Sequence, residues 1–128
     1  MGTVLDYKKL VAEYVVEQTY RGSPLAVKQG ARRSFAMFWA SLTEAQRYEY
    51  ANERRITVVA KSGTTYHLYC RGCVGNVYVV DASKPHYHTR RYCCIPQAPM
   101  FTAHALLIQK LALEHDEGYF LTRAARQD

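Results

Sequence analysis

Cys70 and Cys73 are the residues whose types and spacing most directly suggest chemistry in this chain. Two thiolates three positions apart can bind one tetrahedral Zn²⁺ from a tight turn. The glycines at positions 72 and 75 give the backbone the freedom to curl around the sulfur atoms. A structural zinc site needs four ligands, so this pair supplies half of one.

The remaining ligands would come from the last strand that the sequence predicts. The end of that strand should return to the turn holding the two cysteines, whereas its start should lie roughly 15–20 Å away at about 3.3 Å per residue. This geometry favours Cys93 or Cys94 as a further ligand, with the fourth from the other cysteine, from His104 or from elsewhere, and removes His86 and His88 from the site. The predicted metal set, with zinc as the cofactor, is Cys70, Cys73, Cys93 and Cys94.

The same cysteines also have a purely structural interpretation. Cysteine is among the most buried residue types, and Cys70 shares a predicted strand face with Tyr66 and Leu68, which suggests the core. A thioredoxin-type redox role has less support than the zinc site, because the thioredoxin motif opens a helix and no helix is expected after Cys73. We therefore interpret the motif first as a hairpin turn that presents Arg71 and needs no cofactor, and second as a zinc site.

The net charge of +6 is concentrated in one part of the chain. Residues 54–94 contain seven Lys or Arg and a single acid, whereas the two signs nearly balance elsewhere. Tyrosines alternate with these cations; exposed aromatic rings can stack on bases while arginines neutralise phosphates. In the last strand His86, His88, Arg90 and Tyr92 are expected to share a face. The predicted nucleic-acid-binding residues are Lys61, Tyr69, Arg71, Lys84, His86, His88, Arg90, Arg91 and Tyr92.

Other functions for this basic segment stay open. Tyrosine suits any half-buried strand, and the cations can form a solvated face or meet an acidic protein surface. The chain contains no phosphate-binding glycine loop, nucleophile elbow or dinucleotide fingerprint. We expect a non-enzymatic binding module whose partner is a polyanion, with nucleic acid favoured. The alternative is a protein-interaction factor.

The periodicity of apolar residues predicts the elements that position these side chains. Residues 1–54 are expected to form helices, the last of them opened by a capping box of Thr43 and Gln46. Alternation with a period of two over residues 55–94 predicts four antiparallel strands, and residues 100–126 return to helix. The expected fold is a single α+β domain over residues 1–128, a four-stranded antiparallel meander with N-terminal helices and a C-terminal helix packed on the sheet.

Composition limits the class of protein. The chain is 48% hydrophobic and 22% charged, as in an ordinary globular domain. No apolar run approaches the roughly 20 residues of a membrane span, and acidic residues interrupt the apolar runs that a signal peptide would need. We therefore expect a cytoplasmic protein without a membrane partner, whose cysteines are reduced or metal-bound.

Several short segments in the second half carry a resemblance to a known group. They are Gly75-Asn-Val-Tyr-Val-Val-Asp81, Tyr92-Cys-Cys-Ile-Pro96, the stretch from Leu106 to Glu117, and Phe120-Leu-Thr-Arg-Ala124. Together they resemble the C-terminal part of small uncharacterised proteins of bacteriophage and actinobacterial genomes. The resemblance implies an intracellular accessory or host-interaction protein, so the alternative interaction factor would be phage-encoded and would modulate a host protein. The resemblance brings no activity or site residue with it.

Overall fold

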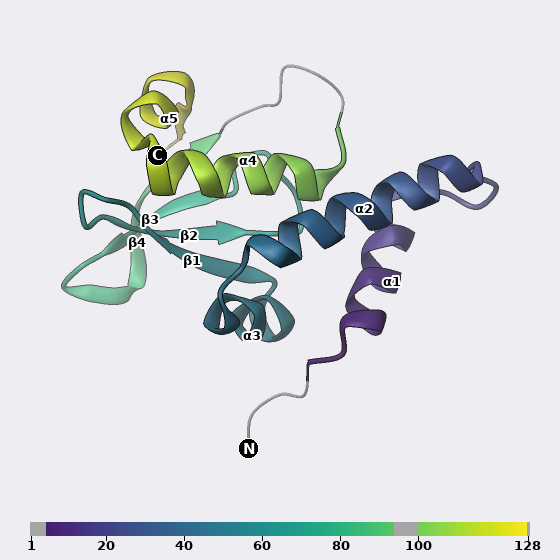
Figure 1. Ribbon diagram of the computed structural model, residues 1–128. Helices are drawn as coiled ribbons and strands as arrows, with labels where there is room; N and C mark the ends of the chain where they lie inside the picture. The colour runs from purple at the N-terminus through teal and green to yellow at the C-terminus, as the bar shows by residue number, and fades with distance from the viewer. Residues whose placement is uncertain (1–4, 94–99, 128) are drawn as a thin grey trace.

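The computed structural model describes residues 5–93 and 100–127 and forms five helices and five strands within them. The elements are α1 (Tyr7–Gln18), α2 (Leu25–Ser41), α3 (Glu44–Glu53), β1 (Arg55–Val59), β2 (Thr65–Tyr69), β3 (Val77–Asp81), β4 (Lys84–Cys93), α4 (Thr102–His115), α5 (Glu117–Arg123) and β5 (Ala125–Gln127). The predicted α+β fold is confirmed: helices from both ends of the chain pack on an antiparallel sheet (Figure 1).

Local signals fix the junction between the helical and the stranded parts. The predicted capping box opens α3: the amide of Gln46 donates to Thr43 Oγ1 over 3.2 Å, and the amide of Thr43 donates to Gln46 Oε1 over 3.0 Å. The helix ends at Arg54, whose φ of 53° is left-handed and turns the chain directly into β1. Gln46 then ties the helix to the sheet by donating to the carbonyl of Thr57 over 2.9 Å.

The sheet is a meander with the strand order β1-β2-β3-β4-β5. Each strand is antiparallel to the next, as the sequence predicts for the first four. The fifth strand was not predicted, since the last helix was expected to run to Arg126. In the structure α5 ends at Arg123, and Ala125–Gln127 pair with the end of β4. An edge strand exposes unpaired backbone groups. β5 covers part of the edge of β4 by pairing with its residues 91–93.

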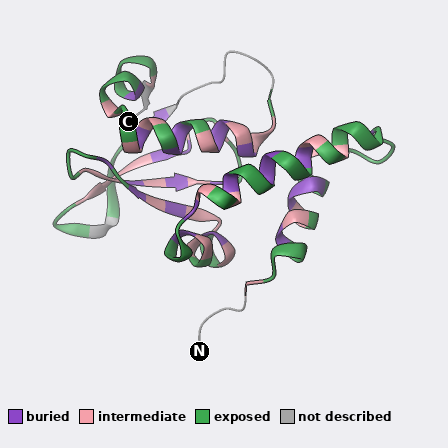
Figure 2. Ribbon diagram, in the orientation of Figure 1, coloured by how far each residue is buried: buried purple, intermediate pink, exposed green. Residues whose placement is uncertain are grey.

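The core lies between one face of the sheet and the helices (Figures 1 and 2). Alternate strand residues enter it, with Ile56 and Leu68 fully buried, and Phe35 of α2 and Leu113 of α4 meet them from the helical layer. The opposite face of the sheet is not covered by α2 or α4 (Figure 1). Within the described residues, no helix combines the length and the apolar character that crossing a membrane requires.

Candidate functional site

Four aromatic and imidazole side chains gather on the uncovered face of the sheet. The ring centroids of Tyr78 and His88 are 4.6 Å apart, those of Tyr69 and Tyr78 5.2 Å, and those of His67 and His88 5.2 Å. They come from three neighbouring strands, so the ring cluster, defined as His67, Tyr69, Tyr78 and His88, crosses the middle of the sheet. Planar π-faces held side by side in this way form a surface on which other rings can stack.

Strand alternation puts the rings of His67, Tyr69 and Tyr78 on this face. In β2 the buried Tyr66 and Leu68 point to the core, so the residues between and after them point the other way. His67 lies directly opposite Tyr78 in the ladder, and side chains opposite each other share a face. The same alternation in the sequence could have identified His67 and Tyr78, which were not among the predicted binding residues.

A β-bulge in β4 decides which of its residues reach the cluster. Val79 pairs with Arg90 whereas Val80 pairs with His88, so Thr89 is an extra residue and the alternation reverses there. The prediction that His88 and Tyr92 share a face is therefore wrong. Tyr92 points to the core, only 8% exposed, with its ring 6.3 Å from that of Phe120. It cannot stack on a base from that position.

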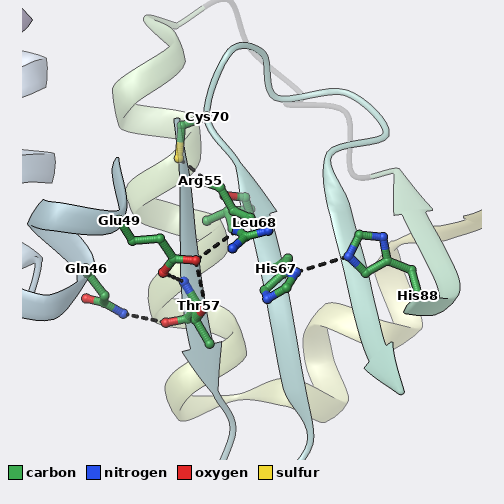
Figure 3. A network of polar contacts seen from close by, with 8 residues as sticks. All are labelled: Gln46, Glu49, Arg55, Thr57, His67, Leu68, Cys70 and His88. Atoms are coloured by element: carbon green, nitrogen blue, oxygen red, sulfur yellow. Dashed lines mark hydrogen bonds and ion pairs between the residues drawn. The ribbon is translucent and has the colours of Figure 1, made fainter. Parts of the chain in front are cut away.

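The two histidines of the cluster contact each other directly. His67 Nδ1 lies 3.0 Å from His88 Nε2 (Figure 3). Burial, together with the charge of Arg55, lowers the pKa of His67 to about 4. The same two causes lower the pKa of His88. Both imidazoles are therefore neutral at pH 7, one ring nitrogen donating a hydrogen bond to the other, and the cluster presents uncharged rings.

Arginines flank the cluster on both sides. The guanidinium of Arg91 lies 6.0 Å from the centroid of the Tyr78 ring, and that of Arg55 lies 6.0 Å from the Tyr69 ring. Arg55 is held in place, because its Nε donates to Glu49 Oε2 over 2.9 Å. The same carboxylate accepts from the amide and the hydroxyl of Thr57 (Figure 3). Arg91 is exposed, which leaves its charge available to an anion.

A shallow hollow of about 340 Å³ continues the cluster toward the β2–β3 loop. It is lined by Tyr69, Tyr78 and His88 of the cluster together with Arg71, Gly72, Val74, Gly75 and Asn76 of the loop. Arg71 is exposed at this end of the sheet. The predicted residues Tyr69, Arg71, His88 and Arg91 are thus brought together around one surface, and Arg55, His67 and Tyr78 complete it.

Amide side chains organise the loop that carries Cys70 and Cys73. Asn76 Nδ2 donates to the carbonyl of Tyr69 over 3.0 Å and to Gln109 Oε1 of α4 over 2.9 Å. Gln109 in turn donates to the carbonyl of Cys73 over 3.2 Å. The loop is therefore fixed to the helical layer by a buried pair of amides, which agrees with the hairpin-turn interpretation.

Of the predicted zinc set, the side chains of Cys70 and Cys73 lie within the described residues. Cys70 is buried, its thiol donates to the carbonyl of Leu68 over 3.3 Å, and burial raises its pKa. In residues 5–93 and 100–127, no group of three or more His, Cys, Asp or Glu side chains is placed to hold an ion. The side chain of Cys93 and all of Cys94 lie outside the described residues, so zinc binding by the full set stays a prediction.

The other predicted binding residues lie away from the ring cluster. Arg90 pairs with Val79, whose side chain packs against the core, so Arg90 faces the helical side of the sheet. There it lies near the hydroxyl of Tyr66, which donates a hydrogen bond to Glu117. Lys61 is exposed in the β1–β2 loop, and Lys84 lies at the β3–β4 turn with its Nζ 5.8 Å from the ring of Tyr87. Both turns are at the end of the sheet opposite the hollow. The side chain of His86 is outside the described residues.

Comparison with known proteins adds no family to this geometry. No protein-family model matches the chain, and the searches of curated proteins and of solved structures also return no match. Any functional conclusion therefore comes from the surface itself.

Proposed function

We propose that the uncovered sheet face binds single-stranded nucleic acid, with bases stacked on the ring cluster and phosphates on the arginines beside it. The observation that carries the proposal is the ring cluster itself: four neutral rings in mutual contact, outside the core, next to the exposed Arg91. The role is that of a binding module without catalysis.

Stacking and charge contribute in different ways. Each base that stacks on an aromatic side chain stabilises a complex by about 1–3 kcal/mol, with little dependence on sequence. The cations supply a salt-dependent attraction that is independent of the bases. The segment of residues 54–94, which contains β1 to β4 and the whole ring cluster, carries seven cations against one acid, so a polyanion is favoured as the partner.

The form of the surface favours single strands over duplexes. A duplex hides the faces of its bases in the stack, whereas a flexible single strand can turn them toward an aromatic surface. The hollow at the β2–β3 loop adds room for a further base beside Tyr69, with Arg71 at its edge for the adjoining phosphate.

The test is a fluorescence anisotropy titration with labelled oligothymidine and oligouridine of about 12 nucleotides, a length in the range of sheet-based single-strand sites. We expect binding at ~50 mM salt, weakening steadily as salt rises, and weaker binding of a duplex of equal length. Arg91→Gln should reduce the affinity more than Arg33→Gln, an exposed arginine on α2 that serves as the matched charge control. No binding at ~50 mM salt would reject the proposal. Equal competition by polyglutamate would support an acidic protein partner in its place.

A further inference from the structure

A second uncovered surface lies between α1 and α2, away from the ring cluster. It is a groove of about 670 Å³. The helical groove is lined by Lys8, Val11, Ala12, Val15, Val16, Thr19, Tyr20, Arg21, Lys28 and Arg32. α1 and the first half of α2 extend beyond the sheet, and much of their outer surface is exposed (Figures 1 and 2).

The floor of the helical groove is an apolar stripe of α1. The lining positions 8, 11, 12, 15, 16 and 19 follow the spacing of one helix face over about three turns. Val11 and Val15 of this stripe also pack against the core, whereas Ala12 and Val16 are exposed to solvent. Val16 is 75% exposed and Tyr20 is 72% exposed. The exposed side chains of Val16 and Tyr20 can therefore contact apolar groups of another molecule.

The rim of the helical groove is entirely basic among the residues that line it. Lys8 lies in the first turn of α1 and Arg21 lies in the loop after that helix. Lys28 and Arg32, four positions apart on α2, form the facing wall. Within the part of the chain that the structure describes, no carboxylate lines the groove. Glu13 of the same helix is paired with Arg54. An occupant must therefore combine apolar groups for the floor with negative charge for both edges.

We propose that the helical groove binds an acidic amphipathic helix of a partner protein. A third helix laid between α1 and α2 would place apolar side chains at i, i+3, i+4 and i+7 on the stripe. Glutamates and aspartates flanking that stripe would meet Lys8, Arg21, Lys28 and Arg32. The groove's length, about three turns or roughly 16 Å, matches a short helical segment. A nucleic acid fits less well, because the floor is aliphatic and gives bases no ring surface beyond Tyr20.

This surface is independent of the sheet face. None of its lining residues belongs to the strands or to the ring cluster. The proposal therefore stands or falls separately from nucleic-acid binding, and its test must show which of the two surfaces an acidic ligand uses.

The test uses the full chain and a synthetic helical peptide of about 14 residues, roughly four turns, with leucines at the i, i+3, i+4 and i+7 positions and glutamates elsewhere. Isothermal titration calorimetry should show binding of this peptide and none of a matched peptide with lysines in place of the glutamates. Arg32→Glu should weaken binding by about tenfold or more, because it reverses a charge on the groove wall. Arg33→Glu, an exposed neighbour outside the lining, is the matched control and should change the affinity less than about twofold.

Further variants separate the possible outcomes. Val16→Glu, at a position exposed enough to keep the fold, should weaken the peptide as Arg32→Glu does. Arg91→Gln on the sheet should leave the affinity for the acidic peptide unchanged. The proposal is overturned if the acidic peptide shows no saturable binding up to about 1 mM. It is also overturned if Arg33→Glu weakens the peptide as much as Arg32→Glu, if the lysine peptide binds equally, or if Arg91→Gln is the change that releases it.

Discussion

The two faces of the sheet use alternate residues of the same strands for opposite purposes. On the helix-covered face Leu68 is fully buried, and the polar groups there are paired within the protein, as Asn76 is with Gln109. On the uncovered face His67 and Tyr78 stay partly exposed and contact mainly other rings. The difference shows that the side chains that stabilise the core and the side chains of the proposed binding surface form separable sets, only one residue apart in sequence.

The largest effect should come from removing a side chain of the covered face. Leu68→Ala leaves a cavity among close-packed core residues and should lower the free energy of unfolding by about 2–5 kcal/mol, measured by urea denaturation. Val59→Ala is the matched control on the neighbouring strand, because Val59 is 60% exposed and its truncation should cost no more than about 0.5 kcal/mol. Equal losses in the two variants would contradict the assignment of the faces.

A smaller loss is expected from the amide pair that fixes the β2–β3 loop. Asn76→Ala leaves the buried Oε1 of Gln109 without its donor and should cost about 1–3 kcal/mol in the free energy of unfolding. A double-mutant cycle with Gln109→Ala should give a coupling energy of about 0.5–3 kcal/mol, because either single change already removes the hydrogen bonds between the two side chains. Simple additivity of the two changes would show that the pair does not hold the loop.

The smallest effect should come from the titration of the uncovered face. The folded state lowers the pKa of His67 from 6.5 to about 4. Between these two pH values the unfolded chain binds more protons than the folded chain. The free energy of unfolding should therefore fall as the pH drops from 6.5 toward 4. Thermal unfolding midpoints measured from pH 7 to pH 4 should therefore fall less steeply in His67→Gln than in the wild type. His115→Gln, an exposed change outside the cluster, should keep the wild-type slope. A His67→Gln profile parallel to the wild type would show that this histidine titrates normally.

Local signals explain which parts of the fold the sequence could predict. The Thr43–Gln46 capping box and the strand alternation through Tyr66 and Leu68 depend on residues close in sequence, and both are present in the structure. β5 depends on the open edge of β4, which no local pattern in residues 125–127 signals. A pairing decided by a distant strand cannot be derived from the propensity of a three-residue segment.

The candidate site was only half predictable for the same reason. Tyr69 follows from alternation alone, whereas Tyr92 was assigned to the wrong face because the extra residue at Thr89 reverses the pattern. Bulges arise from strand pairing and leave little trace in composition. The Cys70–Cys73 spacing suggested a metal, yet the contacts that fix this loop come from Asn76 and from Gln109, a helical residue far along the chain.

The most direct test of the central claim compares two tyrosines for oligothymidine binding. Tyr78 is in the ring cluster, whereas Tyr87, also a tyrosine of this sheet, is 66% exposed and contacts Lys84. Tyr78→Ala should weaken binding by about 1–3 kcal/mol, the contribution of one stacked base. Its free energy of unfolding should fall less than that of Leu68→Ala, since Tyr78 lies outside the core. Tyr87→Ala should leave both quantities near their wild-type values. If the two variants weaken the oligonucleotide equally, or if neither does, the ring cluster is not the binding surface.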